Sequence, residues 1–290
     1  MRFGLLSDIH GNLAALQSVA AALTEEAPLD RIVVAGDLLQ GGPRPLEVWE
    51  ELRTLGWTLV QGNEDAALVT EPPVPAAPPP HPYQRAYSAG LAWTRARIGP
   101  SVLHALAGLP LAHRIATPAD DLLIVHASPR SLDERSGGPH NTAAEVTAAY
   151  SGTGATAIAF GHYHRSFVRP TPFALLVNVA SVGLPLDGRP LAAYTILTAT
   201  PDGWIIEQRR VPYDATEEAA AVVAAEMPPW VPDAVDDTHL GPPAGGVARA
   251  GVPQQAGRTR PDRRDHHLHP THQPGATILR GSRGMVDNGR

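Results

Sequence analysis

Seven side chains that can bind a metal ion come directly after short apolar stretches of this sequence. The stretch 158–160, for example, is followed by Gly161 and then by His162 and His164. Alternate residues of a strand share a face, so these two histidines can point the same way, although such a pair taken alone is more often part of a polar loop. The complete set is Asp8, His10, Asp37, Asn63, His126, His162 and His164.

These residue types predict transition-metal chemistry. Imidazole and carboxylate ligands together suit Mn, Fe, Zn, Ni or Co better than they suit Ca. The set is too large for one tetrahedral ion, but it suits two ions that share a bridging carboxylate. Two divalent ions beside two aspartates leave a net positive charge, even with a bridging hydroxide, and this charge would attract a phosphate ester. The set therefore predicts hydrolysis of a phosphate ester by attack of the bridging hydroxide.

The apolar stretches are typical of buried strands, and the seven side chains stand at their carboxyl ends. Apolar residues at helical spacing occupy 12–26 and 45–55, between the first three strands. This alternation of strand and helix is typical of an α/β sheet with parallel neighbours, where ligands bind at the carboxyl edge. The expected strands are 2–7, 31–35, 57–60, 122–125 and 156–160.

The rest of the chain predicts a single domain with two irregular segments. Residues 71–82 contain seven prolines, which excludes a helix and predicts a stiff insert that either lines the substrate entrance or is a tolerated surface insertion. A helical stretch over 83–109 follows. Further extended segments are expected at 174–179, 191–197 and 204–211.

The domain is expected to cover residues 1–214. An alanine-rich helix follows at 215–227. Residues 228–290 are rich in Pro, Gly, Arg and His and have little apolar periodicity, so they are expected to form a disordered tail.

Composition limits the partners and the compartment. The net charge of −6 gives no basic footprint of the kind that nucleic-acid binding requires. The chain has no cysteine, which excludes disulfides and thiolate ligands. No apolar run reaches the roughly 18 residues of a membrane span, and the N-terminus does not resemble a signal peptide. A cytoplasmic protein without a membrane anchor is therefore expected.

Five sequence blocks, in this order and at this spacing, resemble those of the calcineurin-like metallophosphoesterases. The resemblance covers roughly residues 1–213 and is closest to the compact bacterial and archaeal phosphodiesterases of that superfamily. It implies an α/β fold of four layers, an α/β/β/α sandwich of two mixed sheets with helices outside. The blocks are SDIHGN (7–12), GDLLQGGP (36–43), GNED (62–65), VHAS (125–128) and GHYH (161–164).

The resemblance also implies a role for each of the seven side chains. Asp37 would bridge two divalent ions, of which manganese is favoured over nickel, iron, zinc and cobalt. Asp8, His10 and His164 would hold one ion. Asn63, His126 and His162 would hold the other.

The third block departs from the family pattern. Glu64 stands where the family usually has a histidine that protonates the leaving group or stabilises the transition state. A carboxylate cannot be a cationic donor, so activity is expected to be weakened or redirected, unless Glu64 is a plain surface residue. The second block also lacks the Asp-Arg-Gly of the Ser/Thr protein phosphatases and of the symmetrical dinucleoside tetraphosphatases, so neither activity is favoured.

Two further residues are candidates for substrate contact. Asn12 can either contact the substrate phosphate or cap the helix that follows it. Arg130 can bind a substrate oxygen, although a surface role is as consistent with its position.

The sequence therefore predicts a dinuclear metal phosphoesterase that acts on a small phosphorylated substrate, with phosphodiesters preferred to monoesters. The alternative from another class is a non-catalytic scaffold of the same fold, and a metal-dependent nuclease is a third possibility. The sequence does not predict the physiological substrate or the oligomeric state.

Overall fold

Two mixed β-sheets form the centre of the molecule, and the computed structural model describes residues 1–70, 81–228 and 277–279 of the chain. The strands of the first sheet are β1 (Arg2–Leu6), β2 (Arg31–Val34), β3 (Thr58–Leu59), β9 (Ala192–Thr200), β10 (Gly203–Val211) and β11 (Thr277–Leu279). Those of the second are β4 (Ala112–Ile115), β5 (Leu122–Val125), β6 (Ala157–Phe160), β7 (Ser166–Pro170) and β8 (Leu175–Val179). The strand orders are β11-β10-β9-β1-β2-β3 and β4-β5-β6-β8-β7.

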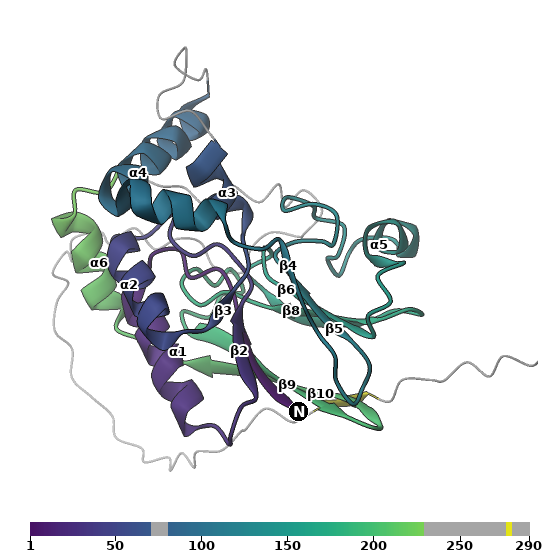
Figure 1. Ribbon diagram of the computed structural model, residues 1–290. Coiled ribbons are helices and arrows are strands. Elements are labelled where there is room, and N and C mark those ends of the chain that lie inside the picture. Colours follow the sequence, from purple (N-terminus) through teal and green to yellow (C-terminus); the bar gives the residue numbers. More distant parts are fainter. Residues whose placement is uncertain (71–80, 229–276, 280–290) are drawn as a thin grey trace, which may run out of the picture.

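Helices lie outside both sheets, so the molecule has four layers (Figure 1). The helix α5 (Ala143–Tyr150) covers the outer face of the second sheet. On the side of the first sheet lie α1 (Leu13–Glu25), α2 (Pro45–Leu55), α3 (Asn63–Thr70), α4 (Pro82–Ala107) and α6 (Ala215–Ala224). This arrangement confirms the four-layer sandwich that the sequence blocks implied.

The central strands are apolar on both faces because each sheet packs against the other sheet on one face and against helices on the other. On β1, Leu5 points between the sheets and Leu6 points toward α1 and α2. On β5, Ile124 points between the sheets and Val125 packs toward α5. Alternation along a strand then buries consecutive residues, which explains the continuous apolar runs of the sequence. The core between the sheets includes Phe3, Leu5, Val33, Leu122, Ile124, Ala159, Val177 and Leu197.

Parallel pairing brings six strand ends to one edge of the sandwich. In the first sheet β1 pairs in parallel with β2, and β2 with β3. In the second sheet β6 pairs in parallel with both β5 and β8. The loops that leave these strands therefore start side by side, and the two sheets face each other across them.

Main-chain hydrogen bonds join the loop after β1 (residues 7–12, the β1 loop) to the loop after β2 (residues 35–44, the β2 loop). The N–H of Asp8 donates to the carbonyl of Gly36 at 3.0 Å, and that of His10 donates to the carbonyl of Asp37 at 3.1 Å. The parallel ladder of β1 and β2 thus continues past the strands. The two loops form one unit with a common backbone.

Several elements differ from the sequence expectations. The short elements α3, α5, β4 and β7 were not predicted, although Thr142 and Glu145 form a capping box that marks the start of α5. The helical stretch 83–109 is broken at Gly99, which has a non-helical backbone (φ 71°, ψ 175°) and is followed by Pro100.

Two predicted segments fall largely outside the described residues. Of the insert 71–82, residues 71–80 lie outside them. Of the tail 228–290, the described part includes β11, which pairs antiparallel with β10, whereas residues 229–276 and 280–290 lie outside. Among the helices of the described residues, none has both the length and the apolar character needed to cross a membrane.

We expect Ile124→Ala to lower the free energy of unfolding by about 2–4 kcal/mol, because Ile124 is fully buried between the sheets and its loss leaves a cavity. Leu111→Ala is the matched control, since Leu111 is 59% exposed and its truncation should change the free energy by less than about 0.5 kcal/mol. Urea denaturation of both variants measures the difference. Equal values for the two variants would contradict the assigned core.

Candidate metal centre

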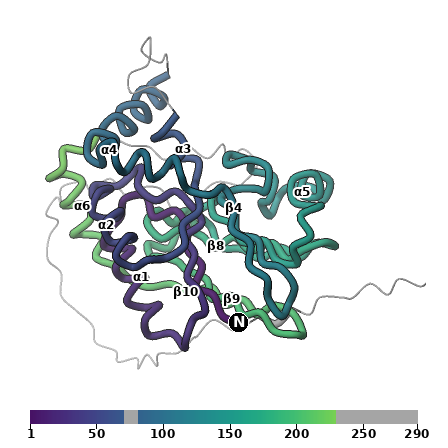
Figure 2. Tube along the Cα trace, viewed as in Figure 1, coloured from purple at the N-terminus to yellow at the C-terminus, as the bar shows by residue number. Residues whose placement is uncertain are grey.

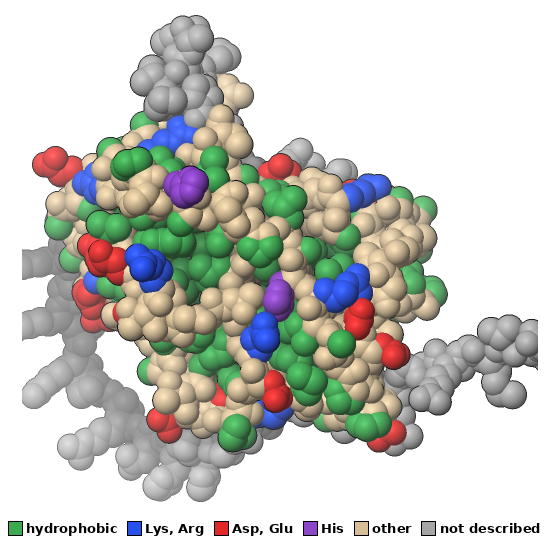
Figure 3. All heavy atoms as spheres, in the orientation of Figure 1, with side chains coloured by type: hydrophobic (Ala, Val, Ile, Leu, Met, Phe, Trp, Pro, Cys, Tyr) green, Lys and Arg blue, Asp and Glu red, His purple; other side chains and the backbone are tan. Residues whose placement is uncertain are grey.

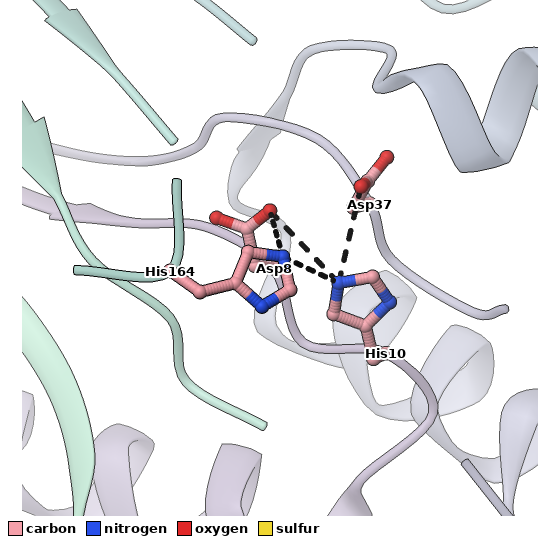
Figure 4. A group of neighbouring side chains, drawn as sticks. All are labelled: Asp8, His10, Asp37 and His164. Carbon is pink, nitrogen blue, oxygen red and sulfur yellow. Dashed lines mark hydrogen bonds and ion pairs between the residues drawn. The ribbon is translucent and has the colours of Figure 1, made fainter. Parts of the chain in front are cut away.

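The structure brings all seven candidate side chains together at the shared edge of the two sheets. Their polypeptide segments follow β1, β2, β3, β5 and β6, and only Asn63 is more than marginally exposed. Four of them, drawn in Figure 4, form a compact group whose ligand atoms all lie within 4.8 Å of one another. The four are Asp8, His10, Asp37 and His164.

Backbone carbonyls fix the orientation of three of the four histidines. The Nδ1 atom of His10 lies 2.7 Å from the carbonyl oxygen of Gln40, and that of His126 lies 2.7 Å from the carbonyl of Ala35. The Nδ1 atom of His164 lies 2.8 Å from the carbonyl of Leu184. A carbonyl only accepts, so each Nδ1 must carry the proton. Each Nε2 of the neutral ring then presents a lone pair to the centre, as in metal-binding histidines.

Two of these lone pairs face each other. The Nε2 atoms of His10 and His164 are 3.2 Å apart. The Nε2 of His164 also lies 3.3 Å from a carboxylate oxygen of Asp8, and that of His10 lies 3.8 Å from one of Asp37. Acceptor atoms so close together are stable only around a proton or a metal cation, and the mixed N and O donor set suits a divalent transition metal.

A second group of acceptors lies next to the first. The Nε2 atom of His126 is 2.8 Å from the side-chain oxygen of Asn63 and 3.3 Å from a carboxylate oxygen of Asp37. The Nδ1 of His162 is 3.0 Å from the same Asn63 oxygen. The Nε2 of His162 is buried and lacks a hydrogen-bond partner among the described residues. Asp37 borders both groups.

The backbone is strained where the candidate ligands stand. Eight non-glycine residues of the described chain have a positive φ, and five of them belong to the candidate set. A residue in this region costs on the order of 1–3 kcal/mol, which the surrounding structure must supply. The five are Asp8 (φ 55°), His10 (50°), Asp37 (55°), His162 (68°) and His164 (55°).

Close packing between the loops explains the glycines of the sequence blocks. A Cβ atom on Gly161 would come within 1.9 Å of the Ser7 hydroxyl and 2.5 Å of an Asp8 carboxylate oxygen. One on Gly62 would come within 2.1 Å of an Asp37 carboxylate oxygen. Only a residue without a side chain lets these loops approach.

Burial and mutual charge shift the protonation of the cluster. Burial disfavours a charged His126, but the neighbouring Asp37 carboxylate outweighs it and raises the pKa of His126 to about 10. The charge of His126 in turn lowers the pKa of Asp37, against the effect of burial. Burial, with the charges of His126 and Arg135, lowers the pKa of His162 to about 3. In the metal-free protein His126 is therefore protonated, and its Nε2 faces the acceptor oxygens of Asn63 and Asp37.

Asp65 is a site residue to which the sequence analysis gave no role. Its carboxylate is fully buried and accepts the backbone N–H groups of Asp37 at 2.9 Å, Leu38 at 3.0 Å and Gly62 at 2.9 Å. Burial and the Asp37 charge raise its pKa to about 7. Asp65 thus holds the backbone of the β2 loop at the point where Asp37 leaves it. The position of Asp65 in the GNED block is the sequence feature that could have indicated this supporting role.

Two more supporting residues that sequence reasoning missed lie in β8 and just after it. Asn178, fully buried, donates to the carbonyl of Gly161 and accepts the N–H of Ala180 at 3.1 Å. The hydroxyl of Ser181 donates to the carbonyl of Asp8 at 2.7 Å. These bonds anchor the turns that carry Asp8 and His162. Asn178 could have been noticed in the sequence as a polar residue within the apolar run of β8.

The two predicted substrate contacts have other partners in the structure. Asn12 caps α1, since its side-chain oxygen accepts the N–H of Ala15 at 3.0 Å, and its amide donates to the carbonyl of Gly183 at 3.1 Å. The capping role is confirmed. Arg130 binds the carboxylate of Glu134, with 2.8 Å from its Nε, and the carbonyl of Ala148 at 3.0 Å. Substrate contact by Asn12 or Arg130 stays a prediction.

Glu64 is buried, which excludes the surface-carboxylate alternative. Its side chain is only 6% exposed, and its N–H donates to a carboxylate oxygen of Asp37 at 2.9 Å. One carboxylate oxygen accepts the hydroxyl of Tyr87, from α4, at 3.0 Å, and the other lies 3.4 Å from the amide nitrogen of Asn63. Glu64 therefore stands directly beside the candidate metal ligands.

The fold and this site define a two-sheet sandwich with an Asp/His metal centre, and comparison with known proteins identifies its family. The calcineurin-like phosphoesterase superfamily domain matches residues 1–202. The chain belongs to that superfamily, whose members typically bind divalent metals.

Two solved structures illustrate the similarity. A metallophosphoesterase from Sphaerobacter thermophilus is 26% identical, with a TM-score of 0.60 over 79% of this chain and 95% of its own. A hypothetical protein from Pyrococcus horikoshii OT3 is 17% identical, with a TM-score of 0.68 over 78% of this chain and 94% of its own. No curated protein sequence matches the chain significantly.

The metal-free protein should lose stability as the pH rises from about 6.5 to about 10. The pKa of His126 rises from 6.5 to about 10 on folding, so its stabilising proton is fully present below 6.5 and is lost as the pH rises toward 10. The slope should reach at most about 1.4 kcal/mol per pH unit. Urea denaturation in the presence of a chelator measures it. His126→Gln should flatten the profile, and an unchanged slope in this variant would contradict the assignment.

Proposed function

We propose that this protein is a phosphoesterase that uses two divalent metal ions. Asp37 bridges the ions. Asp8, His10 and His164 hold one of them, and Asn63, His126 and His162 hold the other. Manganese is proposed first and nickel, iron, zinc and cobalt are the alternatives, since a donor set of imidazoles with carboxylate and amide oxygens suits all five.

The arrangement of the imidazoles is the observation that supports this proposal best. Three rings donate from Nδ1 to backbone carbonyls and turn their Nε2 lone pairs toward two aspartates. Two of those nitrogens are only 3.2 Å apart. A structural core would bury such groups only with complementary donors, whereas a metal site requires bare lone pairs.

Bound divalent ions supply Lewis acidity, which polarises a phosphate ester and activates water at neutral pH. The residues of the chain hold the geometry in which this chemistry takes place. Asp65 and the carbonyls of Ala35, Gln40 and Leu184 fix the ligand orientations, and burial keeps the surrounding dielectric low.

We propose a small phosphorylated substrate, with phosphodiesters preferred to monoesters. Glu64 supports this preference, because a buried carboxylate beside Asn63 and Asp37 offers no positive charge to a dianionic monoester. On the face drawn in Figure 3, basic and acidic side chains are interspersed rather than gathered by sign. This pattern and the net charge of −6 do not favour a nuclease. We propose the cytoplasm as the location.

The rival function is a metal-binding scaffold of the same superfamily that recruits other proteins without catalysis. A scaffold of this kind needs the fold, but it does not depend on a complete set of metal ligands. All seven candidate ligands are present and converge, together with the strained backbone that supports them, and this favours the enzyme.

Replacement of the bridging carboxylate tests the proposal. Wild-type protein reconstituted with Mn²⁺ should hydrolyse a chromogenic phosphodiester, and Asp37→Asn should lower kcat by at least about a hundredfold, since a ligand shared by both ions is lost. Asp202→Asn, in the exposed turn between β9 and β10, is the control and should retain activity. Metal-independent turnover, or full activity of Asp37→Asn, would contradict the enzyme.

The residue at position 64 should influence the choice between diester and monoester. Glu64→His introduces a potential proton donor and should raise kcat for an aryl phosphomonoester by about a hundredfold, the lower end of what a positioned acid contributes. Glu64→Gln, which only removes the charge, should give a much smaller gain. A diester-to-monoester ratio of kcat/KM that stays constant in both variants would refute this role of Glu64.

A further inference from the structure

The helix α6 lies beyond the part of the chain that matches the superfamily, which ends at residue 202. It begins with a strong cap, because the Asp214 carboxylate accepts the N–H groups of Thr216 at 3.0 Å and Glu217 at 2.9 Å. Figure 2 shows α6 beside α1, the helix that follows the β1 loop, and α6 also binds Arg44, the last residue of the β2 loop. The helix is therefore placed to act on both loops.

One residue of α6 reaches the interior. Glu218 is 7% exposed, and one of its carboxylate oxygens accepts a hydrogen bond from the guanidinium of Arg44. The preceding Glu217 also binds Arg44, at 2.7 Å, but its side chain is 57% exposed. The two glutamates thus share a partner and differ in burial.

Arg44, the residue that Glu218 binds, stands where the β1 loop and the β2 loop meet. Arg44 ends the β2 loop, and its N–H donates to the carbonyl of Gly11, in the β1 loop, at 3.2 Å. A Cβ on Gly42 would come within 2.2 Å of the His10 carbonyl, so the two loops touch here. Through Arg44, Glu218 is therefore linked to both loops.

Stability alone does not explain this buried ion pair. Burial raises the pKa of Glu218 in spite of the Arg44 charge, so ionisation of this carboxylate is costly in the folded protein. Buried ion pairs are often no more stabilising than apolar residues of similar size. A role in fixing a geometry accounts for the pair better.

We propose that Glu218 is a positioning residue for the metal centre: through Arg44, whose N–H binds the carbonyl of Gly11, it holds the β1 loop and the β2 loop in the register that metal binding requires. The inference rests on the proposed function, because it concerns the same metal site. It extends the functional unit to α6. A truncation that ends at Asp214 would remove part of the machinery that holds the ligands.

Mn²⁺ affinity of the folded full-length chain tests the inference. We expect Glu218→Gln to weaken Mn²⁺ binding by about tenfold or more, as loss of supporting residues around metal ligands does. Glu217→Gln is the matched control, which removes a largely exposed partner of the same arginine and should stay within about twofold of wild type. Isothermal titration calorimetry gives the affinities, and circular dichroism gives the Tm of each metal-free variant.

The Mn²⁺ affinity and the metal-free Tm together distinguish a positioning role of Glu218 from a role in fold stability alone. A merely structural Glu218 would lower the metal-free Tm and leave the Mn²⁺ affinity of the folded protein at the wild-type value, and this result would overturn the inference. If Glu218→Gln does not fold, Arg44→Gln decides in its place, with the same loss of affinity expected.

Failure of the proposed function gives a different pattern. Wild-type protein that binds Mn²⁺ but hydrolyses no phosphate ester would refute the enzyme, while the contrast between Glu218→Gln and Glu217→Gln would still decide the positioning role. Wild-type protein without Mn²⁺ affinity would overturn both.

Discussion

The hydrogen bonds that join the β1 loop to the β2 loop are the constraint on which the rest of the site depends. They extend the parallel ladder of the first sheet into the region where Asp8, His10 and Asp37 leave the strands. Because the second sheet faces the first, its loops meet the same edge, and the N–H of His162 donates to the Asp8 carboxylate at 3.1 Å. Residues separated by more than 150 positions thus become neighbours with little freedom to move apart.

This rigidity makes a concentration of acceptor atoms possible. Bare imidazole nitrogens, two aspartates and an asparagine oxygen lie within a few ångströms, on a backbone that is strained at five of the seven positions. Such an arrangement costs free energy in the metal-free protein, and the layered core and the supporting bonds from Asp65, Asn178 and Ser181 must offset it. In the proposed function, bound metal cations would offset this cost directly, which gives a reason for features that destabilise the metal-free fold.

Membership in the calcineurin-like phosphoesterase superfamily accounts for the framework but not for every residue around it. Glu64 is buried beside the candidate ligands and is tied to Tyr87 of α4, so a helix that follows the third block contributes to the surroundings of the site. From α6, Glu218 binds Arg44 at the start of α2. Both contacts come from segments whose sequence carries no recognisable metal motif.

The sequence alone determined the strands that carry the candidate ligands, the side chains at their carboxyl ends and the likeness that implied the four layers, because apolar runs and glycine-flanked polar residues are local signals. It did not reveal Asp65, Asn178 or Glu218 as supports, nor that Arg130 binds Glu134. Those roles arise from hydrogen bonds between segments far apart in the chain, and a local pattern of residues does not encode which distant carbonyl or N–H group a buried polar side chain will meet. Only the tertiary structure decided those partners, because a buried polar group is costly without a hydrogen bond and the fold decides which groups lie within its reach.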